Sequence, residues 1–477
     1  MSKRNDNDAA AQPAVPWLVT VMVWLMRVVV GGTFVFSGIV KAIDPWGTYY
    51  KIQEYLLTWG WDSMVSFALV GAFALAVLET LLGVALLLGA YRRGAPIVAA
   101  VMLMVLTPIT LWLAVTNAVP DCGCFGDALI LSNWATFGKN VLLLLGVVFL
   151  FLFGRRVRGL YGPAVQWAVM ALTFALTMAI ATVGYFTQPM IDFRPYPVGT
   201  VLQAPATVGE DDYTFVYEKD GEQQEFTIDE VPDDESGWNF VERRPAHRDS
   251  TASAVTPNIA ITDQGSDVTD EILNDGNSQL LLLFPDLKDV SIAYTFNINE
   301  LADYARRHGA AVYALTSASD GDIAQWADIS MADYPLLVSD DSEIKMIARG
   351  NPAVVYVKDH TIKWKRTLGS ISTDRIHDAT LNLDTLSNDL DPHGSLRNWL
   401  WLYALAMLAL LVINRAPQLL WNLLPRNRAK AKKTASAEGT EGEQAADEAD
   451  EQPVASEEVP AGDSEQKQEK KEETKNQ

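Results

Sequence analysis

Two cysteines, Cys122 and Cys124, are the only cysteines among 477 residues, and one glycine separates them in the segment "PDCGCFGD". Such a pair can supply half of a zinc site, form a reversible disulfide, or close a loop permanently. Tetrahedral zinc takes four ligands, and no histidine or third cysteine lies near the pair in sequence, which argues against zinc. A redox-active pair and a structural loop remain as the two interpretations.

The surroundings of the pair bear on both interpretations. In an oxidising compartment the two thiols can join across a small ring, and a strained disulfide is reduced more easily than a structural one. A ring this small removes little entropy from the unfolded chain, so it would stabilise the loop weakly. Lys41, Asp44 and Lys139 are expected near the same end of the helices, where a lysine would favour the thiolate. Lysines at helix ends also commonly extend to the membrane interface, so both interpretations stay open.

Six apolar stretches must position the cysteine segment. Each has about 18 to 26 residues, enough to cross a hydrocarbon core of about 30 Å as a helix. The last carries Trp399, Trp401 and Tyr403, which suit the interface. We therefore predict an α-helical polytopic membrane bundle of about six transmembrane helices. The predicted spans are 17–40, 64–90, 95–117, 134–153, 164–187 and 397–414.

The basic residues of the short loops predict the orientation of the bundle, because cytoplasmic loops are enriched in Lys and Arg. If the helices alternate in direction, the basic loops and both termini share one side. The cysteine loop 118–133 and the large segment 188–396 then face outward. We predict a multi-pass protein of a bacterial inner (cytoplasmic) membrane with cytoplasmic termini and a retained first helix. The basic residues are Lys3, Arg4, Arg92, Arg93, Arg155, Arg156, Arg158, Arg415, Arg426, Arg428, Lys430, Lys432 and Lys433.

Two charged residues lie deep within the predicted spans. Arg27 and Glu79 lie at similar depths, about ten and eleven residues from the cytoplasmic ends of the first and second helices. A charge in the membrane interior needs a partner. We therefore predict a structural Arg27–Glu79 ion pair, with a proton or quinone path as the alternative role.

The outer segment contains an α/β pattern between residues 279 and 370. Strand-like "QLLLLF", "AAVYALTS" and "YPLLVSDD" alternate with helix-like segments, and a hairpin about Asp359 and His360 closes the pattern. This region resembles the thioredoxin fold, particularly its membrane-attached, peroxiredoxin-like branch, and Pro352 matches the cis-proline position of that fold. The Cys-x-x-Cys motif of the family would fall at residues 285–290, which hold no cysteine. The resemblance thus implies an extracytoplasmic thioredoxin-like domain, residues 276–380, that binds or docks but does not exchange disulfides itself.

The remaining parts flank these two domains. Residues 191–275 are predicted to be β-rich, with a hairpin of "TFVY" and "EFTI" about Asp220-Gly221, and with a linker or extended loop at 242–258. Residues 1–16 form a cytoplasmic arm, and residues 415–477 form a basic, then acidic, disordered tail. The net charge of −22 argues against nucleic acid as a partner.

The membrane part resembles the DoxX and MauE-like proteins, which are small four-helix bundles. The resemblance rests on Arg27–Pro45 ("RVVVGGTFVFSGIVKAIDP"), Leu78–Gly89 ("LETLLGVALLLG") and Asp121–Asp127 ("DCGCFGD"). It implies a four-helix domain at 17–153, followed by a fifth helix within 154–190. MauE-like proteins are associated with assembly of a disulfide-rich periplasmic enzyme, and some DoxX relatives with quinone-linked sulfur oxidation. The fusion with a cysteine-free thioredoxin-like domain is similar to an uncharacterised family of Bacteroidetes-like bacteria.

Three functional hypotheses follow. In the first, the protein handles thiol-disulfide or quinone-linked electrons in the cell envelope through Cys122 and Cys124. In the second, it is a non-catalytic assembly or scaffold protein whose outer domain binds a client. Small-solute transport is the third. No cofactor is evident, a membrane quinone is a candidate electron acceptor, and the expected partners are membrane lipid and an envelope client or thiol protein.

Overall fold

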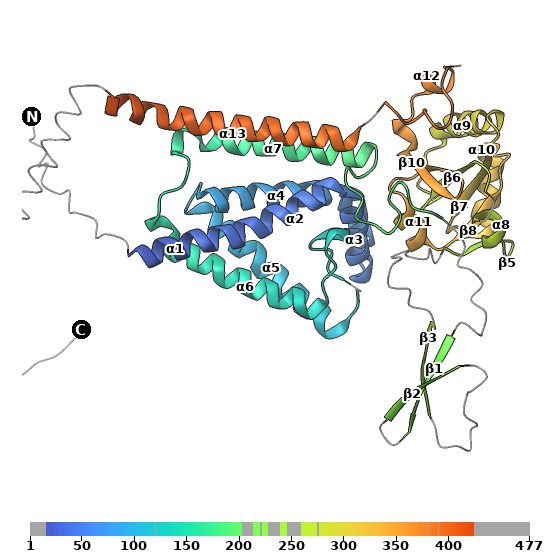
Figure 1. Cartoon of the computed structure of the whole chain (residues 1–477), viewed down its shortest axis with the longest axis horizontal. Coiled ribbons are helices and arrows are strands. Elements are labelled where there is room, and N and C mark those ends of the chain that lie inside the picture. The colour runs from blue at the N-terminus through green and yellow to red at the C-terminus, as the bar shows by residue number, and fades with distance from the viewer. Residues whose placement is uncertain are drawn as a thin grey trace, which may run out of the picture. The chain divides into compact units, whose positions relative to one another are not determined.

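The structure is a computed structural model of the whole chain (Figure 1). The predicted cytoplasmic arm and most of the predicted acidic tail fall outside the residues that it describes. The described residues are 16–119, 121–202, 213–219, 222–227, 239–245, 259–273, 276–378, 380–389 and 391–423.

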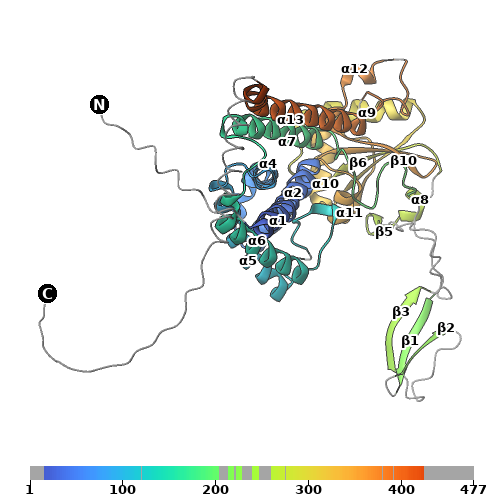
Figure 2. The same cartoon turned by 60° about the vertical axis from the view of Figure 1, so that its left-hand side comes forward.

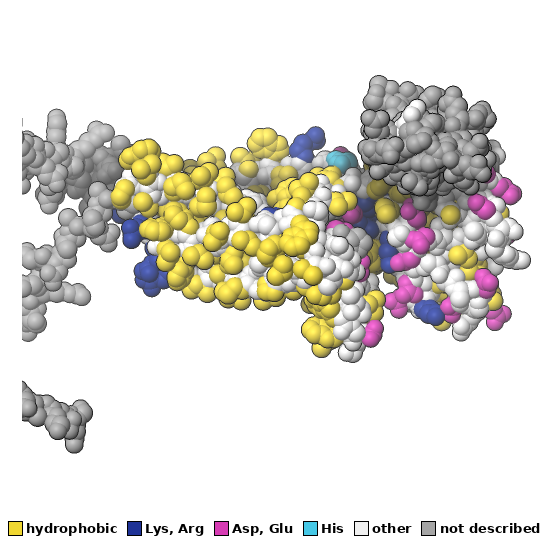
Figure 3. All heavy atoms as spheres, turned by 90° about the horizontal axis from the view of Figure 1, so that it is seen from below, with side chains coloured by type: hydrophobic (Ala, Val, Ile, Leu, Met, Phe, Trp, Pro, Cys, Tyr) yellow, Lys and Arg dark blue, Asp and Glu magenta, His cyan; other side chains and the backbone are white. Residues whose placement is uncertain are grey.

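Six helical stretches are long and apolar enough to cross a membrane, as the sequence predicted. Their bounds are Trp17–Ile43, Asp62–Leu88, Gly94–Thr116, Asn133–Arg156, Pro163–Phe186 and Pro392–Ala416. Hydrophobic side chains cover the visible face of these helices (Figure 3), and many leucines, valines and phenylalanines there are exposed. An apolar exposed surface of this extent fits contact with lipid.

The first span contains two α-helices that a short π-helical turn joins. They are α1 (Trp17–Met26) and α2 (Gly32–Ile43), with the turn at Arg27–Gly31. The other spans contain α4 (Ala68–Leu88), α5 (Gly94–Thr116), α6 (Asn133–Phe153), α7 (Pro163–Phe186) and α13 (Pro392–Leu423). The last helix is thus longer at both ends than the predicted 397–414.

Small residues let α2 and α4 approach closely. A Cβ atom on Gly38 would lie 2.5 Å from the Thr80 backbone nitrogen, and one on Gly83 would lie 2.4 Å from the Val35 nitrogen. Glycine therefore allows backbone contact that any larger residue would prevent, a common device in membrane helix packing.

A further helix, α3 (Pro45–Thr58), lies between the first two predicted spans, where no helix was predicted. Asp44 begins it, because its carboxylate accepts a hydrogen bond from the Gly47 N–H (2.9 Å). Pro45 occupies the first helical position, where proline is well tolerated.

Hydrogen bonds fix α13 against α7. The Tyr161 hydroxyl donates to the Met407 carbonyl (2.9 Å), and the Thr173 and Tyr403 hydroxyls lie 2.9 Å apart. The sixth helix therefore packs on the fifth, although more than 200 residues separate the bonded groups in sequence.

The outer α/β region contains a seven-stranded mixed sheet in the order β10-β9-β6-β7-β8-β4-β5. Strands β6, β7 and β8 are parallel neighbours, whereas β9 is antiparallel to both β6 and β10. The predicted alternation of strands and helices and the closing hairpin are confirmed, and β4 and β5 were not predicted. The strands are β4 (Ile261–Asp263), β5 (Ser266–Asp267), β6 (Gln279–Phe284), β7 (Ala311–Thr316), β8 (Leu336–Ser339), β9 (Ala353–Lys358) and β10 (Thr361–Thr367).

Both faces of this sheet are covered. Leu280 and Leu282 of β6 pack in one core with Ile298 of α9, while Leu281 and Leu283 pack in another with Ile344 of α11. All six residues of β6 are buried, as expected for a central strand with helices on both sides. The helices are α8 (Thr269–Leu273), α9 (Thr295–Arg307), α10 (Asp320–Ser330), α11 (Asp341–Ile347) and α12 (Thr373–Ile376).

A second sheet has three antiparallel strands in the order β2-β1-β3 (Figure 2). Strands β1 (Tyr213–Lys219) and β2 (Glu222–Thr227) confirm the predicted hairpin strands, while the predicted turn residues Asp220 and Gly221 lie outside the described residues. Strand β3 (Asn239–Pro245) corrects part of the predicted linker, because it pairs with β1. Strand pairing with a distant partner is a tertiary contact that local composition does not reveal.

Candidate thiol site and its supports

Cys122 and Cys124 lie in the loop between α5 and α6 as free thiols, with their Sγ atoms 2.8 Å apart. The loop turns sharply because Gly123 and Gly126 have φ angles of 64° and 51°, in the left-handed region that glycine adopts without strain. The Gly123 N–H donates to the Asp121 carboxylate (2.8 Å). The structure therefore brings the two sulfurs into direct contact, as an exchange pair requires.

The two thiols differ in their chemistry. The Cys124 N–H donates to Cys122 Sγ (3.3 Å), and the Thr136 hydroxyl lies 3.6 Å from the same sulfur. The hydrogen bond with the Cys124 thiol, helped by these groups, lowers the pKa of Cys122 to about 6. The same hydrogen bond, together with burial, raises the pKa of Cys124 well above its usual range. At neutral pH these shifts favour the thiolate form of Cys122 over that of Cys124.

Lys139 lies beside this loop, as expected. Its ammonium group is 4.1 Å from the centre of the Phe125 ring, and its charge adds a smaller contribution to the lowered pKa of Cys122. The predicted effect of a nearby lysine is thus present, but it is secondary to the hydrogen bonds between the cysteines.

Lys41 contacts the cysteine loop through hydrogen bonds. Its ammonium group donates to the Glu79 carboxylate (2.8 Å), to the Ser37 hydroxyl (2.7 Å) and to the Cys124 carbonyl (2.6 Å). The Ser37 hydroxyl also donates to the Cys124 carbonyl (2.6 Å). This Lys41 network joins α2, α4 and the cysteine loop, and both charged residues are buried.

The predicted Arg27–Glu79 pair is therefore wrong, because Glu79 pairs with Lys41. Arg27 instead donates to the Gly154, Val157 and Arg158 carbonyls at 3.2, 2.9 and 3.2 Å. These carbonyls follow the C-terminal end of α6, where a cation is favourable. Equal depth in the membrane did not decide the pairing, since the rotation of each helix about its axis also sets which side chains meet.

Arg349 of the sheet domain reaches the same region. Its guanidinium pairs with Asp44 (2.8 Å), the N-cap of α3, and with Asp127 (2.6 Å) in the cysteine loop. The Gln188 side chain accepts from the Arg349 N–H (3.0 Å). Arg349 is 5% exposed, so this Arg349 clamp is a largely buried link between the sheet domain, α3 and the cysteine loop.

The Asn351-Pro352 peptide bond is cis, as expected for Pro352. The Asn351 side chain donates to the Asp286 carbonyl (2.6 Å) and accepts from the Asp286 N–H (3.4 Å). The cis-proline loop therefore supports the segment after β6 where the Cys-x-x-Cys motif was expected and is absent from the sequence.

Sequence reasoning placed Lys41 near the cysteines, but it missed Ser37, the Lys41–Glu79 pair and Arg349. Ser37 and Lys41 are four residues apart on one helix, a spacing that places both on one face, so that signal was available. Arg349 had no such signal, because 305 residues separate it from Asp44. Among the described residues, no group of three or more His, Cys, Asp or Glu side chains could hold a metal ion.

Comparison with known families gives a match for the membrane part. Residues 19–153 match the family of methylamine utilisation protein MauE, and residues 212–246 match a domain of unknown function (DUF8463). No curated protein and no solved structure matches the chain. With its six apolar helices, the chain is a multi-pass membrane protein, and its first four spans form a MauE-like domain.

Proposed function

We propose that this MauE-like protein exchanges disulfides with envelope client proteins through Cys122 and Cys124. The observation that carries the proposal is the asymmetry of the pair, since Cys122 has a pKa of about 6 and contacts a Cys124 thiol of raised pKa. A low-pKa thiolate beside a second thiol is the arrangement of a nucleophile and its resolving group.

The exchange balances without another reactant. The Cys122 thiolate attacks a client disulfide, which forms a mixed disulfide and releases one client thiolate. Cys124 then gives up its proton and attacks Cys122 Sγ, which releases the second client thiolate and leaves a Cys122–Cys124 disulfide. The client gains two electrons and the pair loses two. The reverse sequence oxidises a client dithiol, and a second thiol–disulfide protein returns the pair to its starting state.

The electron acceptor in this proposal is a protein disulfide, and the electron donor is a protein dithiol. The cavity that the cysteine loop lines has a volume of about 10 Å³, about the space of one water molecule. A quinone ring does not fit there, so no step is assigned to a membrane quinone.

The seven-stranded sheet domain supplies the client-binding part of the proposal. We infer a thioredoxin-like domain because β6 lies between parallel β7 and antiparallel β9, with hairpin partner β10 at the edge, and because the Pro352 bond is cis. The Arg349 clamp would then hold this domain beside the cysteine loop. The proposed compartment is the outer side of a bacterial cytoplasmic membrane, where disulfides persist.

A non-catalytic scaffold is the second candidate, and the two anchors of the cysteine loop favour it. The Lys41 network and the Arg349 clamp both hold the loop by contacts that do not use a sulfur atom. In that function the cysteines shape the loop and the sheet domain binds the client.

Trapping of mixed disulfides in intact cells distinguishes the two functions. In a Cys124→Ser variant, Cys122 can attack a client but the product cannot be resolved, so disulfide-linked adducts that disappear on reduction should accumulate. A Cys122→Ser variant is the matched control and should trap less, because burial still raises the pKa of the remaining Cys124 thiol. If neither variant forms adducts although both insert normally into the membrane, disulfide exchange is excluded and the scaffold function remains.

A further inference from the structure

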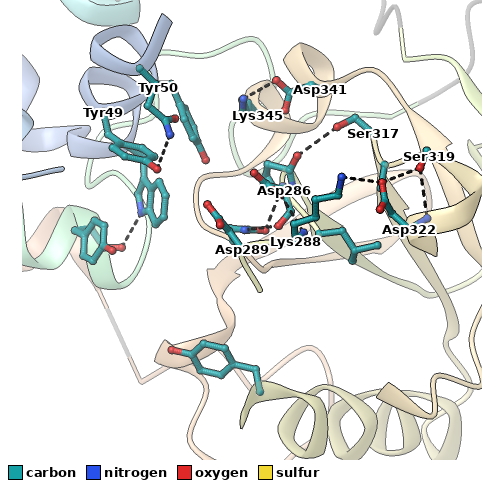
Figure 4. Close-up of a pocket in the computed structure, with 18 residues that line it drawn as sticks. Tyr49, Tyr50, Asp286, Lys288, Asp289, Ser317, Ser319, Asp322, Asp341 and Lys345 are labelled. Atoms are coloured by element: carbon teal, nitrogen blue, oxygen red, sulfur yellow. Dashed lines mark hydrogen bonds and ion pairs between the residues drawn. The ribbon is translucent and has the colours of Figure 1, made fainter. Parts of the chain in front are cut away.

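A pocket of about 700 Å³ lies between α3 and the sheet domain (Figure 4). Trp46, Tyr49 and Tyr50 of α3 line one side, together with Tyr185 at the end of α7. The loop after β6, which carries Asp286 and the residues that follow it, lines the opposite side. The pocket therefore has an aromatic wall and a polar wall that face each other.

The aromatic wall is held in place by contacts within it. The rings of Trp46 and Tyr185 stack with centroids 4.9 Å apart, and the Trp46 indole N–H donates to the Tyr185 carbonyl (3.0 Å). Tyr49 packs edge-on against Trp46 (5.6 Å), and its hydroxyl accepts from Gln53 (2.7 Å). Faces of Trp and Tyr rings attract cations within about 6 Å.

The polar wall carries unneutralised negative charge. Its two cations already have partners, since Lys288 pairs with Asp322 (3.1 Å) and Lys345 with Asp341 (2.5 Å). Asp286 and Asp289 form no ion pair with any described residue. The Asp286 carboxylate accepts a hydrogen bond from the Lys288 N–H (3.0 Å), which leaves its charge in place. Among the described residues, the wall thus has two carboxylates without a cation partner opposite the aromatic rings.

The behaviour of Tyr49 agrees with this arrangement. Burial raises its pKa, and the negative charges of Asp289 and Asp286 raise it further. The negative charge of both carboxylates is therefore felt at the Tyr49 hydroxyl. A cation between the two walls would lie near the carboxylates and the aromatic rings.

We propose that this pocket binds the basic side chain of an extended polypeptide, with the ammonium or guanidinium group between the Trp46–Tyr49 rings and the Asp286 and Asp289 carboxylates. The volume exceeds that of one side chain, which leaves room for neighbouring residues of the polypeptide. The aliphatic stem of Lys or Arg would cover ring surface while its charge meets the carboxylates. This binding does not depend on disulfide exchange.

Peptide binding to the purified full chain in lipid nanodiscs tests the proposal. The chain carries Cys122→Ser and Cys124→Ser, so no thiol chemistry contributes. The probe is a fluorescent, end-blocked Ala-Ala-Lys-Ala-Ala peptide, compared with the same peptide containing norleucine instead of lysine. We expect the lysine peptide to bind more tightly, by about threefold to thirtyfold, and to lose affinity as salt increases.

Variants locate the site. Asp286→Asn, Asp289→Asn and Tyr49→Leu, each made separately, should reduce the preference for lysine. Tyr49→Phe should retain most of it because the ring remains. Asp328→Asn is the charge-matched control, since Asp328 is exposed on α10 and does not line the pocket. Each variant is used only if its elution volume and helical circular dichroism match those of the parent chain.

Three results would overturn the proposal. The first is equal binding of the lysine and norleucine peptides. The second is an equal loss of binding in Asp328→Asn and in the pocket variants. The third is binding of n-butylammonium as tight as that of the lysine peptide, which would assign the pocket to a free amine and not to a polypeptide. Failure of the mixed-disulfide experiment alone would leave this proposal standing, because the test chain has no cysteine.

Discussion

At the scale of single residues, the pKa of Cys122 is lowered and that of Cys124 is raised. We predict that alkylation of Cys122 in a Cys124→Ser variant falls about tenfold between pH 7 and pH 5, because a thiol of pKa about 6 loses its thiolate over that range. The serine hydroxyl keeps a donor toward Cys122. Rates of iodoacetamide labelling, read by mass spectrometry, measure the profile.

The control for that profile is Cys122→Ser, in which only burial still raises the pKa of Cys124, so Cys124 should react more slowly at neutral pH than Cys122 does in Cys124→Ser. A midpoint near that of an ordinary thiol, about 8.5, for both cysteines would contradict the assignment of Cys122 as nucleophile. Because the pKa of Cys122 is lower in the folded chain than in the unfolded chain, its ionisation stabilises the folded loop. This stabilisation is complete above the pKa of the unfolded thiol and is lost as the pH falls through about 6.

At the scale of helices, the Lys41 network joins α2 to α4 and to the cysteine loop. Lys41→Met leaves the Glu79 carboxylate buried without its cation, and Glu79→Gln leaves Lys41 without its carboxylate. We predict that each change lowers the free energy of unfolding by about 3 to 5 kcal/mol, and that the double variant loses less than the sum. Thermal unfolding in detergent measures the coupling.

The matched comparison is the pair Arg27→Met and Glu79→Gln, which should have additive effects because Arg27 bonds to carbonyls beyond α6. Two results would favour the originally predicted Arg27–Glu79 pair. One is additive loss of unfolding free energy for Lys41→Met with Glu79→Gln, and the other is strong coupling of Arg27→Met with Glu79→Gln.

At the scale of the whole molecule, the Arg349 clamp connects the sheet domain to the membrane part. We predict that Arg349→Met lowers the free energy of unfolding by about 2 to 3 kcal/mol, because it leaves the mostly buried Asp44 and the half-exposed Asp127 unpaired. Hydrogen exchange of residues 121–132 should become faster.

A surface pair provides the control for the clamp. Lys358→Met removes an exposed partner of Asp384 and should change the free energy of unfolding by less than about 1 kcal/mol. If both variants behave alike, or if exchange in the cysteine loop stays unchanged in Arg349→Met, the clamp does not order the loop.

Topology is the second prediction for the whole molecule. The arginines of the α4–α5 and α6–α7 loops lie close together, since Arg92 donates to the Arg155 carbonyl (3.0 Å), and basic loops favour the cytoplasmic side. Reporter fusions should therefore be cytoplasmic at residue 93 and after residue 430, and outward at residue 300. A cytoplasmic reporter at 300 would place the cysteines in a reducing compartment and remove the basis for disulfide exchange.

The sequence by itself determined the six apolar spans, strands β6 to β10 of the α/β region and the cysteine pair, because hydrophobic length, strand patterning and residue type are local properties. Cys122, Cys124 and Pro352 could be selected as chemically distinctive without coordinates. Only the tertiary structure decided the partners of Glu79 and Arg27, since helix rotation is set by packing at glycines such as Gly38 and Gly83. It also decided the Arg349 clamp and the pocket beside α3, because contacts between residues hundreds of positions apart leave no periodic trace in the chain.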